Sequence, residues 1–95
     1  MTDYADIINV VVQKLIDTQG KNFVVAQANK SGEVELDEDG EVISVDNGEK
    51  ALEDILEQFN NVMGPVAYAL SARAIEDEYG DVDLELPEEL REQLG

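Results

Sequence analysis

Residues 46–80 read DNGEKALEDILEQFNNVMGPVAYALSARAIEDEYG and form the longest periodic segment of the chain. Its apolar residues recur at steps of three and four, which places them on one face of a helix. They are Leu52, Ile55, Leu56, Phe59, Val62, Met63, Val66, Leu70 and Ala74. The other side is polar, which is typical of a helix that packs its apolar stripe on a core. Asp46 and Glu49 predict a capping-box-like start.

The Met63-Gly64-Pro65 step interrupts this segment. Proline inside a helix costs about 3 kcal/mol, because it lacks an amide hydrogen and crowds the carbonyl four residues back. Either one long helix kinks at Gly64 and Pro65, or a helix ends near Met63 and Pro65 opens a second one. The continuous apolar phase favours the kink, whereas the Gly-Pro pair favours the break. We expect two helical segments that meet at an angle.

A second apolar stripe follows Pro65, on roughly the opposite side from the first. A helix that is apolar on two faces is usually buried on both, so the second layer comes either from the rest of the fold or from another chain. We give these alternatives equal weight. The second alternative predicts an interface formed by Tyr68, Ala72, Ile75 and Tyr79, together with Arg73. Arg73 alternatively pairs with Asp77, one turn further on.

Residues 56–74 contain the run Met63-Gly64-Pro65-Val66-Ala67 and the later pair Arg73-Ala74. This region resembles a small helical module appended to bacterial signalling proteins, which carries a Gly-Pro-Ile-Ala step, an apolar run and a basic-Ala pair. Val66 stands where that module has isoleucine. The resemblance covers about a fifth of the chain. It implies a role in signalling or assembly and assigns no functional residue.

The chain has 95 residues, enough for one domain with a modest core. It contains no cysteine, histidine or tryptophan. Disulfides are therefore excluded, and most routes to structural zinc and to nucleophilic catalysis are removed. We expect a protein that is not an enzyme and that has no cofactor.

The charge is strongly acidic, with 23 acidic residues against 6 basic ones and a net charge of −17. Nucleic acid and anionic membranes would be repelled, so we expect neither as a partner. The 43% hydrophobic content argues against disorder. The composition resembles that of cytoplasmic proteins of salt-in halophiles, haloarchaea above all, where molar salt shortens the screening length to about 3 Å. The alternative is an acidic protein of another organism that binds a basic partner.

The N-terminus, MTDYAD, lacks the basic start of a signal peptide. The apolar run at residues 7–12 is too short to span a bilayer. We therefore expect a cytoplasmic protein.

The rest of the chain predicts an α+β fold in a single domain over residues 1–95. A helix is expected over residues 1–20, capped by Thr2 or Asp3 and ended by Gly20. Residues 22–45 predict a three-stranded antiparallel meander, with a strand over 22–29 and a hairpin at Asp39-Gly40. A kinked helix or helix pair follows over 46–80. Residues 81–95 predict an exposed strand or extended arm and then a short helix that begins at Pro87.

The acidic hairpin offers one candidate metal site. Aligned on Gly40, its acids follow the spacing of an EF-hand loop at Glu35, Asp37, Asp39 and Asp46. The match is incomplete, because Glu35 replaces the first aspartate, Asp46 replaces the bidentate glutamate, and no helix enters the loop. A hairpin turn explains the segment better, so no metal site is predicted.

Together these patterns predict a non-enzymatic adaptor or scaffold of a halophilic cytoplasm. It would form a homo-oligomer or bind a protein partner, with a possible place in signalling or assembly. The alternative is a regulatory protein that binds a small ligand or a divalent cation.

Overall fold

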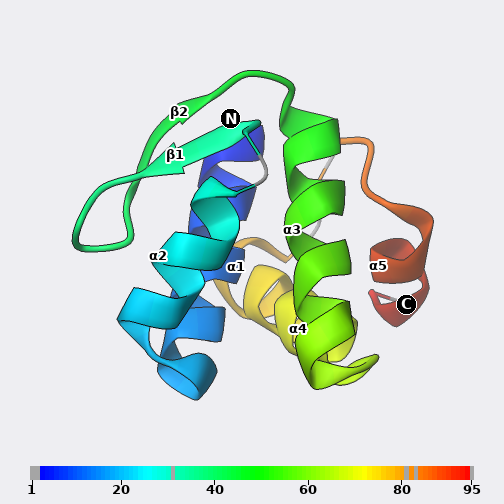
Figure 1. Ribbon diagram of the computed structural model, residues 1–95. Coiled ribbons are helices and arrows are strands. Elements are labelled where there is room, and N and C mark those ends of the chain that lie inside the picture. The colour runs from blue at the N-terminus through cyan, green and yellow to red at the C-terminus, as the bar shows by residue number, and fades with distance from the viewer. Residues whose placement is uncertain (1–2, 31, 81, 83, 95) are drawn as a thin grey trace.

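The computed structural model describes residues 3–30, 32–80, 82 and 84–94. Within them the chain forms five helices and one two-stranded antiparallel sheet, so the α+β class is confirmed with helices dominant. The elements are α1 (Tyr4–Gln19), α2 (Lys21–Asn29), β1 (Val34–Leu36), β2 (Val42–Val45), α3 (Gly48–Met63), α4 (Val66–Tyr79) and α5 (Glu88–Gln93). Figure 1 shows the hairpin at the upper left beside α2 and α1, with α3 upright, α4 at the bottom and α5 at the right.

The first helix begins and ends where the sequence predicts. Asp3 is its N-cap and forms a capping box with Asp6: the Asp6 amide donates to Asp3 Oδ1 at 3.0 Å, and the Asp3 amide donates to Asp6 Oδ2 at 3.2 Å. Thr2, the other candidate cap, lies outside the described residues. Gly20 ends the helix with a φ of 93°, a conformation that suits glycine.

The strand predicted over residues 22–29 is wrong, because this segment is helix α2. Val24 and Ala28 are buried one helical turn apart, and the segment packs against α1, α3 and the hairpin. The turn at Gly20 folds α2 directly back on α1, so burial of one helical face outweighs the β preference of Phe23, Val24 and Val25. The described residues therefore contain a hairpin and not a three-stranded meander.

The hairpin itself is confirmed. Val34 pairs with Val45 and Leu36 pairs with Val42, with a bulge between Glu35 and Leu36. Asp37 organises the turn, since its Oδ1 accepts the amides of Asp39 and Glu41, each at 2.9 Å. Val34 and Leu36 face the core, and Ile43 faces outward.

The break at Pro65 is confirmed as two separate helices. Gly64 ends α3 with a φ of 80°, and Pro65 stands immediately before α4 with a φ of −60°. The predicted Asp46–Glu49 cap is wrong by one residue: Asn47 is the N-cap of α3, and its Oδ1 accepts the Lys50 amide at 3.2 Å. Asp46 still belongs to the hairpin, because its amide donates to the Glu33 carbonyl at 2.9 Å.

The C-terminal segment wraps back to the start of the chain. Leu86 and Leu90 are buried in the core, and α5 begins after Pro87, as predicted. The Tyr4 hydroxyl donates to the Glu85 carbonyl at 2.6 Å. The backbone of Gly48 lies against the same tyrosine, so closely that a Cβ there would sit 2.4 Å from Tyr4 Cβ and Cγ.

The arm predicted before α5 is described only at residues 82 and 84–87, where it forms no strand. Residues 81 and 83 of this predicted segment lie outside the described part of the chain.

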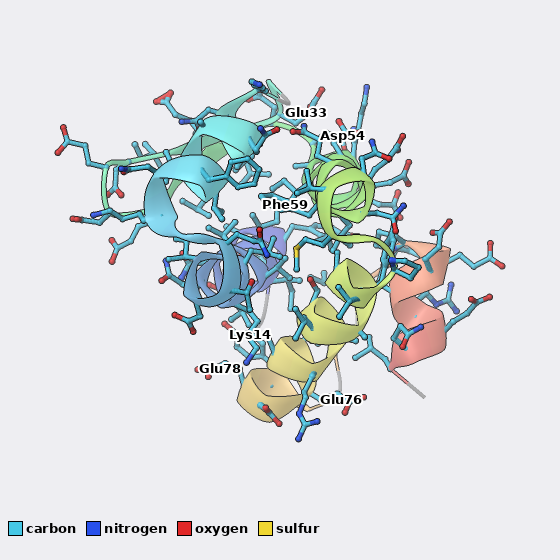
Figure 2. The ribbon with its side chains drawn as sticks, turned by 60° about the horizontal axis from the view of Figure 1, so that its bottom comes forward. Lys14, Glu33, Asp54, Phe59, Glu76 and Glu78 are labelled. Atoms are coloured by element: carbon cyan, nitrogen blue, oxygen red, sulfur yellow. The ribbon has the colours of Figure 1, made fainter. Side chains whose placement is uncertain are left out.

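One core joins all of these elements. Its buried side chains come from all five helices, from β1 and from the arm. Figure 2 shows Phe59 pointing into the space between the helices, whereas Glu33, Asp54, Glu76 and Glu78 lie on the outside. The radius of gyration is 11.7 Å, close to the ~12 Å expected for a compact domain of this length. None of the described helices combines the length and the apolar character that crossing a bilayer would need.

Candidate interaction surface

The predicted interface stripe on α4 faces the inside of the molecule. Ala72 and Ile75 are only 2% and 0% exposed, and Tyr68 and Tyr79 are half-buried against the core. Helices α1 and α5 supply the layer that covers this face. The rest of the fold therefore accounts for the second stripe, and Ala72 and Ile75 offer no surface to a partner.

The stripe expected to face the core does so along α3 as far as Phe59, but its later residues emerge at the turn between α3 and α4. Val62 is 51% exposed and Val66 is 47% exposed. The inward face of α4 is formed by Ala67, Ser71, Ala72 and Ile75. The periodicity misleads here because Gly64 leaves helical geometry, with a φ of 80° and a ψ of −168°, so α4 starts in a new direction with a new rotational phase.

The same turn contains no charged residue. No charged residue occurs between Glu57 and Arg73, in a chain that is 31% charged. The exposed residues of this stretch, called the neutral corner below, are Asn61, Val62, Pro65, Val66 and Ala69. The neutral corner thus combines exposed apolar side chains with an absence of carboxylates.

A hollow beside the neutral corner has an acidic edge. It has a volume of about 300 Å³ and is called the α5 hollow below; it is lined by Asn60, Pro65, Tyr68, Glu89, Glu92 and Gln93. The pKa of Tyr68 is raised, chiefly by burial and then by the carboxylates of Glu89 and Glu57. The carboxylates of Glu89 and Glu92 and the ring of Tyr68 therefore border the apolar surface on its α5 side.

Arg73 is exposed on α4, two helical turns after Val66. Ion pairs within 4.0 Å among the described residues join Lys50 to Glu33 and Arg91 to Glu85, each at 3.8 Å. The predicted pair between Arg73 and Asp77 is therefore not formed. A second hollow of about 350 Å³ lies beside Arg73, lined also by Ala69, Glu76, Asp77 and Gln93.

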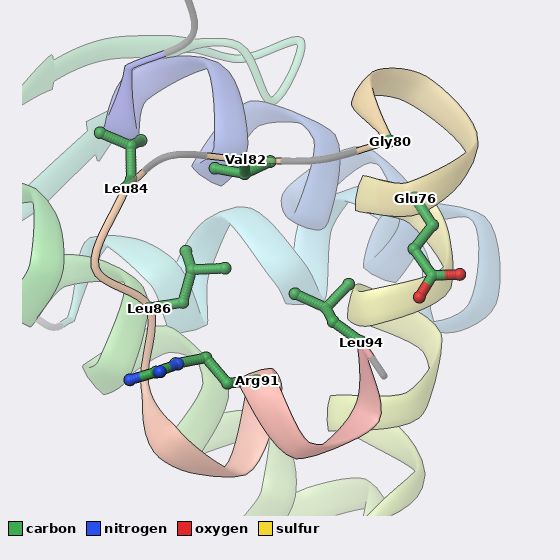
Figure 3. Close-up of a pocket in the computed structure, with 7 residues that line it drawn as sticks. All are labelled: Glu76, Gly80, Val82, Leu84, Leu86, Arg91 and Leu94. Carbon is green, nitrogen blue, oxygen red and sulfur yellow. The ribbon is translucent and has the colours of Figure 1, made fainter.

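A larger groove lies between the end of α4, the arm and α5. It has a volume of about 530 Å³, and Figure 3 shows the residues around it: Glu76, Gly80, Val82, Leu84, Leu86, Arg91 and Leu94. The walls are mostly aliphatic, with one acid and one base among them. This groove was not predicted from the sequence, where the alternating apolar residues Val82, Leu84 and Leu86 of the arm were the only signal for it.

The four acids of the calcium-loop candidate are not gathered into a site. Glu35 and Asp46 line a hollow of about 460 Å³ on the hairpin, together with Glu33. Asp37 and Asp39 lie in the turn, where the Asp37 carboxylate already accepts two amides. Over the residues that the structure describes, no group of three or more acidic side chains is placed to hold a metal ion.

Comparison with protein-family models, with characterised proteins and with solved structures finds no match to this chain. Its function is therefore inferred from the surface features above.

Proposed function

We propose that this chain is a non-enzymatic protein-interaction module that works in a halophilic cytoplasm. The observation that carries the proposal is the neutral corner, where Val62 and Val66 are about half exposed within a stretch that has no charge. Isolated exposed apolar residues are common on protein surfaces. Here they coincide with the longest uncharged run of a chain whose net charge is −17.

Charge explains why contact would occur at this place. Facing like charges across an interface costs several kcal/mol, so two acidic surfaces do not associate readily. Molar salt shortens the screening length to about 3 Å and suppresses that repulsion, while apolar burial remains favourable. The neutral corner carries no carboxylate of its own, so another protein can cover its apolar side chains without burying a carboxylate that belongs to it.

Two further features support the proposal. The absence of histidine and cysteine removes the residue types that most often serve as acid–base or nucleophilic groups. Residues 56–74, which resemble the helical module of signalling proteins, include the whole neutral corner. This coincidence favours an adaptor or scaffold in signalling or assembly.

A photo-crosslinking residue tests the proposal. A benzophenone side chain replaces Val62 in one variant and Ile43 in a matched control, which is exposed to 57% but lies on the acidic hairpin. Both variants are irradiated in a halophilic host grown at molar salt. We expect protein adducts from position 62 and not from position 43. Equal adducts from both positions, or none from position 62, would contradict the proposal.

A second candidate is the binding of a small amphipathic molecule in the groove of Figure 3. Its volume of about 530 Å³ lies within the range of small-ligand sites, about 300–1,000 Å³. Arg91 on the lining suits a ligand with one carboxylate. Calorimetry with medium-chain carboxylates in molar potassium chloride, on the natural chain and on Leu84→Asn, tests it. If the heat of binding is the same for Leu84→Asn and the natural chain, the groove is not the binding site. If no heat of binding is observed, carboxylates of this type are not ligands.

A further inference from the structure

We propose that the partner of the neutral corner is a second copy of this chain, docked through two antiparallel α4 helices. In this dimer, Arg73 of each copy enters the α5 hollow of the other. The inference rests on the proposed function and names its partner.

The outer face of α4 has the symmetry that such a dimer needs. Val66, Ala69 and Arg73 are exposed on it, and Leu70 is half-buried beside them. Val66 and Arg73 are two turns apart, about 10.5 Å along the helix axis. A two-fold axis between Ala69 and Leu70 would place Val66 of one copy opposite the partner's Arg73, and the reverse. The small side chain of Ala69 at this centre allows the two helices to approach closely.

Charge complementarity selects the register. The α5 hollow is lined by Pro65, the residue before Val66, and presents Glu89, Glu92 and the ring of Tyr68. The partner's Arg73 would reach this hollow with a planar guanidinium, which pairs with carboxylates and stacks on aromatic rings. Within the described chain, neither Arg73 nor these two glutamates forms an ion pair. In the dimer, Arg73 of each copy would lie against Glu89 and Glu92 of the other copy.

Other partners fit less well. A basic protein would satisfy the α5 hollow but would place a cation against Arg73. An acidic protein would satisfy Arg73 but would face Glu89 and Glu92. A second copy supplies both signs of charge at the required positions, and it brings uncharged residues, Ala69 and Leu70, together at the two-fold axis.

A charge swap tests the dimer. Arg73→Glu alone and the double variant E89R/E92R each remove the proposed pairs, and we expect each to weaken dimerisation at least about tenfold in Kd. Combining all three substitutions in one chain restores opposite charges and is expected to restore the dimer. Molar mass is measured by size-exclusion chromatography with light scattering, at the lowest salt concentration where circular dichroism shows the natural chain folded.

Two further variants control the design. E38R/E41R changes the net charge by the same amount as E89R/E92R, but on the exposed hairpin turn, and should leave the dimer intact. Ala69→Trp fills the centre of the helix pair and should give a folded monomer.

The possible outcomes separate this inference from the proposed function. If the natural chain is monomeric at all concentrations in molar salt, the proposal that the partner is a second copy is wrong. If the natural chain dimerises but the triple variant does not, the proposed antiparallel arrangement of the α4 helices is wrong. In either case, adducts with a different protein from position 62 would leave the proposed function standing, and no adducts there would remove it as well.

Discussion

Helices α3 and α4 follow each other in the chain and have similar lengths, 16 and 14 residues, yet their outer faces differ. The outer face of α3 carries Glu49, Glu53 and Glu57, all exposed. The first two turns of α4 have no charge, and their exposed residues are apolar. In a chain this acidic, the place where carboxylates are missing is more informative than the places where they occur. The uncharged face is the surface on which we propose that another protein docks.

The largest expected effect is the loss of the fold at low salt. Lowering the ionic strength to about 0.01 M lengthens the screening distance to about 30 Å, so the carboxylates repel one another across the molecule. We expect cooperative unfolding as salt is removed, followed by far-UV circular dichroism.

Substitutions on the outer faces of α3 and α4 should shift this salt-dependent unfolding in opposite directions. Glu53→Gln should lower the salt concentration at the unfolding midpoint, and Ala69→Glu should raise it. Stability that is independent of salt in all three chains would contradict this account of the acidic surface.

The next effect concerns the two ends of α3. Gly48→Ala brings a Cβ into the rigid part of Tyr4, and we expect it to cost about 1–3 kcal/mol through overpacking. Gly64→Ala meets open space and should cost only the strain of its φ of 80° and ψ of −168°, a region used almost only by glycine, about 1–3 kcal/mol. Chemical unfolding in molar salt measures both. Gly48→Ala with the stability of the natural chain would show that Tyr4 moves without cost.

A smaller effect is expected from the buried face of α4. Ser71 is fully buried and its Oγ has no hydrogen-bond partner within the described chain, whereas the buried face of α3 is purely apolar. Ser71→Ala should therefore stabilise the protein by about 1 kcal/mol, by removing an unsatisfied hydroxyl and by favouring the helix. Ser44→Ala, on the exposed hairpin, should change little. A clear loss of thermal stability in Ser71→Ala would show that the hydroxyl is satisfied in solution.

The smallest effect is on pH dependence, and α3 does not contribute because it contains no tyrosine. The pKa values of Tyr68 and Tyr79 are raised, first by burial and then by nearby carboxylates. The folded state therefore holds these protons more tightly than the unfolded state, whose tyrosine pKa is about 10. The resulting stability is fully present below pH ~10 and is lost as pH rises through the folded pKa values.

We expect Tyr68→Phe to reduce this alkaline loss of stability. Thermal unfolding at a series of alkaline pH values measures it. Identical pH profiles for the natural chain and Tyr68→Phe would contradict the expected contribution of Tyr68.

Local signals in the sequence predicted much of the fold. The caps at Asp3 and Gly20, the Asp39-Gly40 turn and the Gly64-Pro65 break each act within a few residues, so the elements that they bound were found. The strand predicted over residues 22–29 failed because its apolar residues suit either structure, and contacts with distant elements decided between them. The cap of α3 shifted to Asn47 because Asp46 was already held by Glu33 of the hairpin.

The candidate surface was predicted in part. The sequence singled out the region around Gly64 and Pro65 and left open what covers the second stripe of α4; the fold covers it, whereas Val66, which was expected on the core side, is exposed. A helical phase cannot be carried across Gly64, whose backbone leaves helical geometry, so the exposure of Val66 was not visible in the sequence. The α5 hollow was also hidden, because Tyr68 and Glu89 are brought together only by the folded chain.

Tyr4 also has a consequence for the order of events in synthesis. Its hydroxyl is bound by the carbonyl of a residue 81 positions later, and its ring lies on the first residue of α3. A ribosome has made most of the chain before the residue that holds Tyr4 exists. The first helix therefore leaves the ribosome with its N-terminal end uncovered, and the native packing there is completed only after residue 85 has emerged.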